Sequence, residues 1–468
     1  MNQKTNKPEP MDLRGKRVTV MGLGSFGGGV GVVRFLVEQG AIVTVTDLRT
    51  GEELADSIVE LGDVQPARWV LGEHREEDFV SADLAVVNPG VPKSSRFVQR
   101  AIEAGVPLSS EMNLFWERCR GRIIGVTGSN GKSTTTAMTH AILQQSFLLG
   151  QGPRAWLGGN IGKSLLSDLD QIQPGDWVVL ELSSFQLEDL DRLQVSPEIA
   201  IVTNFSANHL DRHGTVEEYR RAKQTILRWQ KPEDIAVLNE SDQDVSEWPV
   251  NGVRLGFGLV DRGGGAIAEE DLRQWLSVPG EHNVQNALGA ACAALALGVS
   301  VEAIEKGLRE YKALPHRLEL VCEKNGRLFY NDSLATTPES TMMALGAFQN
   351  PQKPVVLLLG GYDKGSDFHF LARCVWSSSV KAIALMGTTG PKIGELIREA
   401  GQELTHEDNE IAMRTCSNFR EAFEWGVGQS QAGDVILLSP ACASYDWFKN
   451  FQDRGEQFRK LAEEWGGE

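Results

Sequence analysis

Residues 123–133 read Ile-Ile-Gly-Val-Thr-Gly-Ser-Asn-Gly-Lys-Ser, and this stretch decides the fold class. Its apolar half, Ile123–Thr127, predicts a short buried strand, and the Lys-Ser-Thr-Thr-Thr run that begins at Lys132 predicts the start of a helix. A glycine-containing turn between a strand and a helix offers backbone N–H groups to phosphate, a Lys neutralises charge, and a hydroxyl can bind Mg²⁺. The stretch therefore predicts a nucleoside-triphosphate loop, whose expected contacts are Gly128, Ser129, Asn130, Gly131, Lys132, Ser133 and Thr134.

Short apolar runs rich in Val and Ile alternate with amphipathic stretches along the whole chain. The runs Arg17–Met21, Val30–Gln39 and Ile42–Asp47 show the strand–helix–strand rhythm of parallel sheets. The third such series is expected to open at Leu328–Asn331. At 468 residues the chain also exceeds what one hydrophobic core usually holds. We therefore expect an α/β protein of three domains: a Rossmann-like domain over 1–111, a central domain of the phosphate-loop ATPase type over 112–313, and a second Rossmann-like domain over 314–468.

Charge and cysteine usage narrow the class of protein. Lys and Arg number 46 against 63 Asp and Glu, a formal net charge of −17, which disfavours binding to nucleic acid or to an anionic membrane surface. The six cysteines have no metal-binding or disulfide-type spacing, which favours a reducing compartment. The first ten residues lack an apolar signal core, and no run of eighteen apolar residues occurs. We expect a cytoplasmic, monomeric protein whose residues 1–10 form a disordered tail.

A second glycine-rich turn follows the first predicted strand. Gly22–Gly27 reads Gly-Leu-Gly-Ser-Phe-Gly, and Asp47 closes the next strand about twenty residues later. Taken alone, this pattern indicates a dinucleotide site, as in a nicotinamide oxidoreductase. The same geometry suits any diphosphate at a helix N-terminus with an acid on a ribose hydroxyl, so UDP fits equally well.

Three polar residues follow the strands beside the first loop. Glu181 ends the apolar run Trp177–Leu180, where a carboxylate could hold Mg²⁺ opposite Ser133. His209 follows another strand at the same expected sheet edge and could reach a second ion, with a surface loop histidine as the alternative. Lys223 falls on a helix expected to start near Thr215, where a solvated lysine would be the ordinary outcome.

Ordered motifs along nearly the whole chain resemble the Mur ligase family. The Thr-Gly-x-Asn-Gly-Lys-Ser form of the loop at 127–133 is typical of that family. Each of the further motifs is short, but the order in which they occur along the chain is specific to the family. They are Gly158–Gly162, Glu181–Leu187, Asn208–Gly214, Tyr219 with Ala222-Lys223, Gly280–Asn283 with Asn286-Ala287, Pro315–Arg317, Asn331–Ser333 and Ser439–Ser444.

The resemblance implies roles in ATP and metal binding. It makes Lys132, Glu181, His209 and Lys223 the catalytic group, with two Mg²⁺ ions held by Ser133, Glu181, His209 and Lys223. Lys223 would be carbamylated by CO₂, which turns a cation into a carboxylate. The adenine edge would be bound by Asn283 and Asn286, for which core-facing helix residues are the alternative. Arg317 and Asp332 would contact the phosphate and ribose region.

The resemblance also implies substrate contacts. A UDP-sugar would lie in the first domain, with its diphosphate on Leu23, Gly24, Ser25 and Phe26, its uridine beside Asp47 and Arg49, a wall at Asn88 and Gly90, and Asn160, Ser183 and His209 towards the sugar-peptide end. Thr336, Lys364, Ser444 and Phe451 would bind an amino acid. Leu334 stands where the family usually has Lys, so one positive charge expected near that amino acid is missing.

The implied reaction is ATP-dependent amide-bond formation. The runs Ser439–Ser444 and Phe448–Phe451 are similar to those of family members that add D-glutamate to UDP-N-acetylmuramoyl-L-alanine, through an acyl phosphate, in peptidoglycan precursor synthesis. Because of Leu334, a Mur-type ligase with another acceptor, such as L-glutamate, stays open. A folate-type ligase is less consistent, since it lacks a uridine domain ahead of the ATP loop. The remaining alternative is a non-catalytic nucleotide switch.

Overall fold

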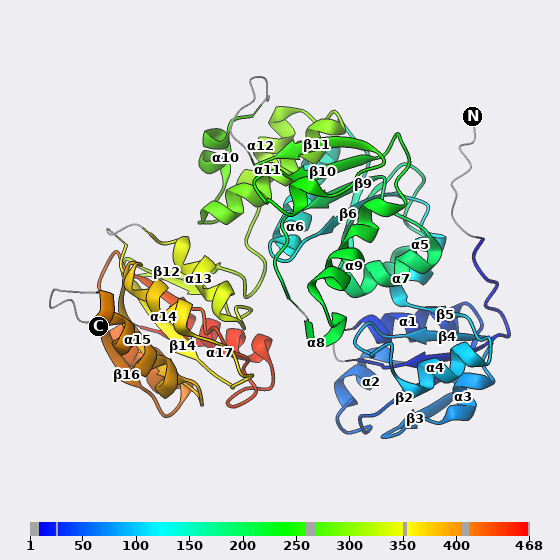
Figure 1. Ribbon diagram of the computed structural model, residues 1–468, viewed down its shortest axis with the longest axis horizontal. Helices are drawn as coiled ribbons and strands as arrows, with labels where there is room; N and C mark the ends of the chain where they lie inside the picture. The colour runs from blue at the N-terminus through cyan, green and yellow to red at the C-terminus, as the bar shows by residue number, and fades with distance from the viewer. Residues whose placement is uncertain are drawn as a thin grey trace. The chain divides into compact units, whose positions relative to one another are not determined.

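The computed structural model describes residues 9–24, 27–208, 210–258, 267–349, 353–404 and 411–466, and these residues build three β-sheets (Figure 1). They divide into two compact units, the first made of Met1–Leu272 and Asn286–Leu308 and the second of Arg273–Gln285 and Arg309–Glu468. Most of the tail expected to be disordered, residues 1–8, lies outside the described part of the chain.

The first sheet is parallel throughout and has the order β3-β2-β1-β4-β5. Its strands are short and largely buried, and helices connect them in the expected alternation. The elements are β1 (Arg17–Met21), α1 (Gly28–Glu38), β2 (Ile42–Asp47), α2 (Ala55–Leu61), β3 (Arg68–Leu71), α3 (Glu76–Val80), β4 (Leu84–Val87), α4 (Arg96–Glu103) and β5 (Leu108–Ser109), followed by α5 (Glu111–Arg118).

The second sheet is also parallel, in the order β11-β10-β9-β6-β8-β7. Its central strand β6 is the apolar stretch that leads into the glycine-rich loop at 128–131. The elements are β6 (Arg122–Thr127), α6 (Lys132–Leu148), β7 (Ala155–Gly159), η1 (Leu165–Asp168), β8 (Trp177–Glu181), α7 (Ser184–Leu193), β9 (Ile199–Val202), α8 (Leu210–His213), α9 (Val216–Arg228), β10 (Ile235–Asn239), η2 (Val245–Glu247), β11 (Val253–Phe257), α10 (Glu269–Trp275), α11 (Glu281–Ala296) and α12 (Val301–Glu310).

The third sheet is mixed, in the order β12-β13-β17-β14-β15-β16, with only β12 antiparallel to its neighbour. Apolar clusters cover both of its faces, one under α13–α15 and one under α16 and α17. The elements are β12 (Glu319–Lys324), β13 (Arg327–Asn331), α13 (Pro338–Gly346), β14 (Val355–Gly360), α14 (His369–Trp376), β15 (Val380–Met386), α15 (Gly390–Leu404), β16 (Ala412–Thr415), α16 (Phe419–Gly428), β17 (Val435–Leu438) and α17 (Phe451–Glu464).

The expected α/β class is confirmed, and the described strands agree with the predicted βαβ rhythm. The third series does not open at Leu328 as expected, because β12 precedes it. This strand was missed because its sequence, Glu-Leu-Val-Cys-Glu-Lys, is charged and half-exposed rather than apolar. The domain boundaries at 111 and 313 stay predictions.

The first two sheets share one hydrophobic cluster. It runs from Val18 and Val20 on β1, through Phe115 and Trp116 on α5, to Leu180 on β8. These two sheets therefore belong to one packed body, in agreement with the first compact unit. Among the described residues, no helix has the length and apolar character needed to cross a membrane.

Helix α1 packs unusually close to the end of β1. A Cβ atom on Gly29 would lie 2.0 Å from the carbonyl oxygen of Leu23, whereas a Cβ on the neighbouring Gly28 would meet nothing within 4 Å. The turn that follows β1 thus depends on a glycine at position 29 for the approach of helix to strand.

We predict that Gly29→Ala lowers the free energy of unfolding by about 1–3 kcal/mol, since the added methyl group must displace backbone atoms. The matched variant Gly28→Ala should change stability by less than about 1 kcal/mol, because the site is open and alanine favours helix. Urea and thermal unfolding of both variants provide the measurement. Equal effects of the two substitutions would contradict the close packing at Gly29.

Candidate functional site

The loop between β6 and α6 is held in a conformation that requires its glycines. Gly128 has φ +149° and Gly131, which caps α6, has φ +80°. A Cβ on Gly128 would lie 1.9 Å from Thr203 Oγ1, and one on Gly131 would lie 2.2 Å from Asn286 Oδ1. The loop backbone is therefore pressed against β9 and α11, and its amides are presented at the N-terminus of α6.

Side chains from the segment after β9 fix the loop. Asn204 accepts a hydrogen bond from the backbone N–H of Asn130 at 2.9 Å and donates to its carbonyl at 3.0 Å. Ser129 Oγ donates to the carbonyl of Ser206 and accepts from its N–H. The loop shape is thus set by long-range contacts as well as by its own sequence.

Two lysines converge on the loop. Lys132 Nζ donates to the carbonyls of Gly128 at 3.0 Å and Ser129 at 2.8 Å, and Lys223 Nζ donates to the same Gly128 carbonyl at 2.6 Å. Lys223 lies on α9 and is only 1% exposed. Burial lowers its pKa well below the usual value, and the nearby charge of Lys132 lowers it further while Glu181 opposes the shift. The expected helix start near Thr215 is confirmed, but this lysine is not the solvated side chain that helices usually carry.

Glu181 ends β8 beside the loop and is 2% exposed. Its Oε1 accepts a hydrogen bond from Asn160 Nδ2 at 3.0 Å, while its Oε2 is buried with no hydrogen-bond partner. A buried carboxylate oxygen without a partner is costly and is the kind of atom that a cation satisfies. Glu181 thus fits the predicted magnesium role, with Ser133 in the first turn of α6.

The other proposed metal ligands are only partly described. His209 lies outside the described residues. Within the described residues, no group of three or more His, Cys, Asp and Glu side chains is arranged to hold a metal.

The two asparagines expected at the adenine have different surroundings. Asn286 accepts a hydrogen bond from Thr135 Oγ1 at 3.2 Å and lies against Gly131, so it belongs to the wall of the phosphate loop. Asn283 donates to the carbonyl of Pro279 at 2.6 Å, one turn back along the chain. Their role at a nucleotide base stays a prediction.

The first sheet gathers the residues expected at a UDP-sugar. Asp47 Oδ2 accepts the backbone N–H of Leu23 at 3.0 Å and a bond from Arg49 Nη2 at 3.1 Å. Burial raises the pKa of Asp47, but the hydrogen bonds and charge of Arg49 outweigh it and hold the pKa below its usual value. The charged Asp47 therefore anchors the turn that holds Gly24; Ser25 and Phe26 lie outside the described residues.

The loop after β4 closes the other side of this site. Asn88 Oδ1 accepts the N–H of Gly90 at 2.9 Å, and a Cβ on Gly22 would lie 3.0 Å from Asn88 Cβ. The structure thus brings the carboxyl ends of β1, β2 and β4 together, as the sequence predicted for Leu23, Asp47 and Asn88. Ser183 caps α7 in a capping box with Gln186, and its role at the substrate stays a prediction.

In the second unit, Asp332 follows β13 and is buried. Its Oδ1 accepts the N–H of Leu318 at 3.1 Å and its Oδ2 accepts Ser439 Oγ at 2.8 Å. Burial raises the pKa of Asp332 from 3.8 to about 7, although both hydrogen bonds and the charge of Arg317 oppose the shift. The charge of Arg317 acts on Asp332 in the structure, and the role of both residues at ATP stays a prediction.

Sequence reasoning missed Arg454, which organises the loops expected to bind the amino acid. The side chain is 1% exposed and donates to Ser333 Oγ at 2.9 Å, the Ser333 carbonyl at 2.8 Å and the Cys442 carbonyl at 3.0 Å. Burial lowers its pKa to about 10. Nothing local marks Arg454 as buried, since it sits on α17 among charged neighbours, and only its position three residues after Phe451 connects it to a motif.

The predicted amino-acid contacts lie on neighbouring loops of the third sheet. Ser333 Oγ donates to the carbonyl of Phe451, and Tyr362 pairs with Ala443, so the segments that carry Lys364 and Ser444 run side by side. Lys364 is exposed over the ring of Tyr445, and Ser444 is buried. Thr336 donates its N–H to the carbonyl of Leu334, which is half-buried at the position of the missing lysine.

These features define a class: a protein with a phosphate loop, a buried lysine and a carboxylate on one parallel sheet edge, joined to a second nucleotide-type site. Family models match in order as the Mur ligase MurD-like N-terminal domain over residues 16–110, the Mur ligase middle domain over 126–259, and the Mur ligase glutamate ligase domain over 316–442. The chain belongs to the Mur ligase family.

Curated relatives match nearly the whole chain. It is 39% identical to UDP-N-acetylmuramoylalanine--D-glutamate ligase of Roseiflexus sp. (strain RS-1), over 97% of this chain and 99% of that protein. The protein of the same description from Acidobacterium capsulatum is 36% identical, over 96% and 97%. The crystal structure of UDP-N-acetylmuramate-alanine ligase MurC from Thermotoga maritima has a TM-score of 0.61 at 21% identity, over 96% and 99%, and supports the fold.

The buried Asp332 generates a prediction for pH dependence. With a pKa of about 7 in the folded protein and 3.8 in the unfolded chain, the folded state holds a proton between these values that the unfolded state has lost. The contribution of Asp332 to the free energy of unfolding is therefore fully present below about pH 4 and is lost as pH rises through about 7. Asp332→Asn removes this dependence. The unfolding free energy of the variant, relative to that of the wild type, should therefore rise by on the order of 4 kcal/mol between about pH 4 and about pH 7.

Urea unfolding across this pH range measures the difference. Asp363→Asn, at an exposed aspartate of the same unit, is the matched control, and its difference from the wild type should not follow the same curve. A difference for Asp332→Asn that does not change with pH would show that the carboxyl is ionised throughout.

Proposed function

We propose that this protein is an ATP-dependent ligase that adds D-glutamate to UDP-N-acetylmuramoyl-L-alanine through an acyl phosphate, a cytoplasmic step of peptidoglycan precursor synthesis. The observation that carries the proposal is the near-complete match to curated D-glutamate ligases of several bacteria. The geometry agrees with it, because one compact unit contains both a diphosphate-type turn at Leu23 and a triphosphate-type loop at Gly128–Gly131.

In this mechanism, the loop amides and Lys132 bind the phosphates of ATP and stabilise charge on the transferred phosphoryl group. The substrate carboxylate attacks the γ-phosphorus, its new oxygen–phosphorus bond forms as the bond to ADP breaks, and the acyl phosphate results. The amino group of glutamate then attacks the acyl carbon, loses a proton and expels phosphate. No side-chain nucleophile of the protein is needed.

Glu181 and Ser133 would hold one Mg²⁺, and His209 with the carbamate of Lys223 would hold the second. The ions supply charge neutralisation at the phosphates. The support for this arrangement is the partnerless Glu181 Oε2 and the position of Lys223 beside the loop. Asn160 orients the Glu181 carboxylate through the other oxygen.

For the uridine end, we propose that Asp47 and Arg49 bind uracil or ribose while Leu23 and Gly24 bind the diphosphate, with Asn88 and Gly90 as a wall. For the acceptor, Lys364 supplies a cation and Thr336, Ser444 and the backbone at Phe451 supply neutral donors. Arg317 and Asp332 would act at the phosphate and ribose region of ATP. The protein would work as a monomer without nucleic-acid or membrane partners.

Leu334 is the observation that keeps an acceptor other than D-glutamate in consideration. An apolar side chain occupies the position of the family's usual lysine. L-Glutamate carries the same two carboxylates and differs only in the direction of its amine, so stereochemistry is the sharpest discriminator.

The first test is phosphate release by the purified protein with ATP, UDP-N-acetylmuramoyl-L-alanine and a panel of D- and L-amino acids. We expect release with D-glutamate and none with L-glutamate. Lys132→Met is the control for the ATP site and should reduce the rate by roughly 10²–10³-fold, since a charge-stabilising donor is lost. Release that needs no amino acid would favour a nucleotide switch, and release with L-glutamate alone would change the acceptor.

The second test concerns carbamylation of Lys223. The neutral amine attacks CO₂, one N–C bond forms and one proton leaves the nitrogen, so the buried group becomes an anion. Burial at 1% exposure favours the neutral, nucleophilic amine, and the neighbouring charge of Lys132 stabilises the anion that forms. Lys223→Ala should lower the rate by roughly 10²-fold or more, with partial recovery in formate, acetate or propionate.

Lys306→Ala, at a half-exposed lysine of α12, is the matched control and should retain full activity. A carbamate signal in the NMR spectrum of protein equilibrated with ¹³C-bicarbonate should be present in the wild type and absent from Lys223→Ala. Wild-type activity of Lys223→Ala, or recovery with chloride as well as with carboxylates, would contradict a carbamate at this position.

A further inference from the structure

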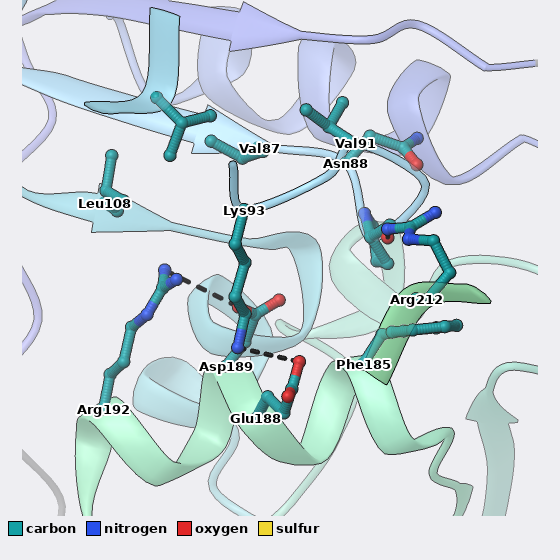
Figure 2. A pocket seen from close by; sticks show the side chains of 12 residues that line it. Val87, Asn88, Val91, Lys93, Leu108, Phe185, Glu188, Asp189, Arg192 and Arg212 are labelled. Carbon is teal, nitrogen blue, oxygen red and sulfur yellow. Dashed lines mark hydrogen bonds and ion pairs between the residues drawn. The ribbon is translucent and has the colours of Figure 1, made fainter. Parts of the chain in front are cut away.

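The seam between the first and second sheets is bridged by a side chain that no part of the proposed function uses. Arg212, on α8, reaches across to the loop after β4, where its Nη1 donates to the carbonyl of Gly90 at 3.0 Å and its Nη2 donates to the carbonyl of Pro89 at 3.3 Å. Figure 2 shows this side chain pointing from α8 towards the loop that carries Asn88 and Val91. A planar guanidinium is suited to binding two neighbouring carbonyls at once.

The Arg212 guanidinium packs against an aromatic ring of α7. Its carbon lies 4.9 Å from the centre of the Phe185 ring, and that ring stacks at 5.0 Å and 3° on His213. His213 Nε2 is 2.9 Å from Ser184 Oγ, in the first turn of α7. The direction of Arg212 is therefore set by the half-buried Phe185 ring, which stacks on the buried His213, as well as by its two carbonyl partners.

The loop that Arg212 contacts is the proposed wall of the UDP-sugar site. Asn88 is tied to β1 through the carbonyl of Met21, and its side chain lies against Gly22 and Gly24 of the diphosphate turn. A second bridge, the ion pair of Lys93 with Glu188 on α7 at 2.7 Å, fixes the far end of the same loop. The loop is thus held from the second sheet at two points while it shapes the site on the first.

The stack also continues towards the phosphate loop. The ring centres of His213 and Tyr219 are 5.1 Å apart, and the Tyr219 hydroxyl is 3.4 Å from Ser129 Oγ. The segment that carries Arg212 is therefore in contact, through packed side chains, with both nucleotide-type sites of this unit.

We propose that Arg212 is a positioning residue that fixes the 88–91 loop, and with it the UDP-sugar site, against the middle sheet. The proposal rests on the proposed function for the identity of the ligand, but not for the existence of the bridge. Arg212 acts through the loop carbonyls of Pro89 and Gly90 and does not itself touch the substrate.

Steady-state kinetics with UDP-N-acetylmuramoyl-L-alanine varied test the proposal. Arg212→Gln should raise KM for the UDP-sugar roughly tenfold, because two charge-assisted hydrogen bonds are lost, while KM for ATP and kcat change by less than about threefold. Arg212→Lys keeps the charge but cannot bind two carbonyls in a fork, so its KM should lie between. Suppose instead that Arg212→Lys has the wild-type KM and that the rise in KM of Arg212→Gln disappears at high salt. The residue would then contact substrate charge directly, and the positioning role would be wrong.

Arg192→Gln is the matched control. Arg192, on α7, lines the same pocket as Arg212, but its ion pair is with Asp189 of its own helix (Figure 2). Its KM for the UDP-sugar should stay within about twofold of the wild type. An equal rise in KM for both variants would overturn the assignment to Arg212.

Hydrogen–deuterium exchange of the ligand-free protein separates the bridge from the function. The N–H groups of Gly90 and Val91 bond to Asn88, and both should exchange faster in Arg212→Gln while the strands β1 and β4 keep their protection. Unchanged exchange in this loop would overturn the bridge even if the enzyme is the proposed ligase. Faster exchange in a protein that has no ligase activity would leave the bridge intact and refute the proposed function instead.

Discussion

One carbonyl oxygen, that of Gly128, accepts hydrogen bonds from the Nζ atoms of both Lys132 and Lys223. This convergence depends on the unusual backbone of Gly128, whose φ of +149° and contact with Thr203 leave no room for any side chain. The carbonyl provides a hydrogen-bond acceptor for both lysine side chains in a place from which water is largely excluded. The loop conformation, the depth of Lys223 and the phosphate-binding amides are consequences of the same local arrangement.

The parallel topology explains why so much chemistry collects around that carbonyl. In a parallel sheet all strands end at one edge, so Thr127 of β6, Glu181 of β8 and the Thr203–Asn204 segment after β9 are neighbours although they are distant in sequence. The first sheet repeats this with Leu23, Asp47 and Asn88. Two nucleotide-type sites are thus built by one rule, on sheets that share a hydrophobic core.

Much of this could be predicted from sequence because it is encoded locally. The strand–glycine–helix turns after β1 and β6, and the start of α9 at Thr215, follow from residues within one short window. Features that depend on distant partners could not be predicted in that way. Arg454 looks like an ordinary charged residue of α17, and only the folded chain shows that it binds Ser333 and Cys442.

The edge strand β12 and the bridge at Arg212 were missed for the same reason. A half-exposed strand has no apolar signature, and the target of Arg212 is a pair of backbone carbonyls more than a hundred residues away, which carry no sequence information. Conversely, the resemblance supplied what local pattern could not, since nothing around Lys223 in sequence distinguishes it from a solvated helix lysine.

The edges of the three sheets have a consequence for folding in a crowded solution. Four of the six outer strands contain charged residues: Arg68 in β3, Arg254 in β11, Glu319 with Glu323 and Lys324 in β12, and Arg414 in β16. A fifth, β5, has only two residues. Charged or very short edges are poor templates for a strand from another molecule. A chain that must assemble two parallel sheets and one mixed sheet, whose pairings are slow to form, is thereby protected against intermolecular pairing and aggregation while it folds.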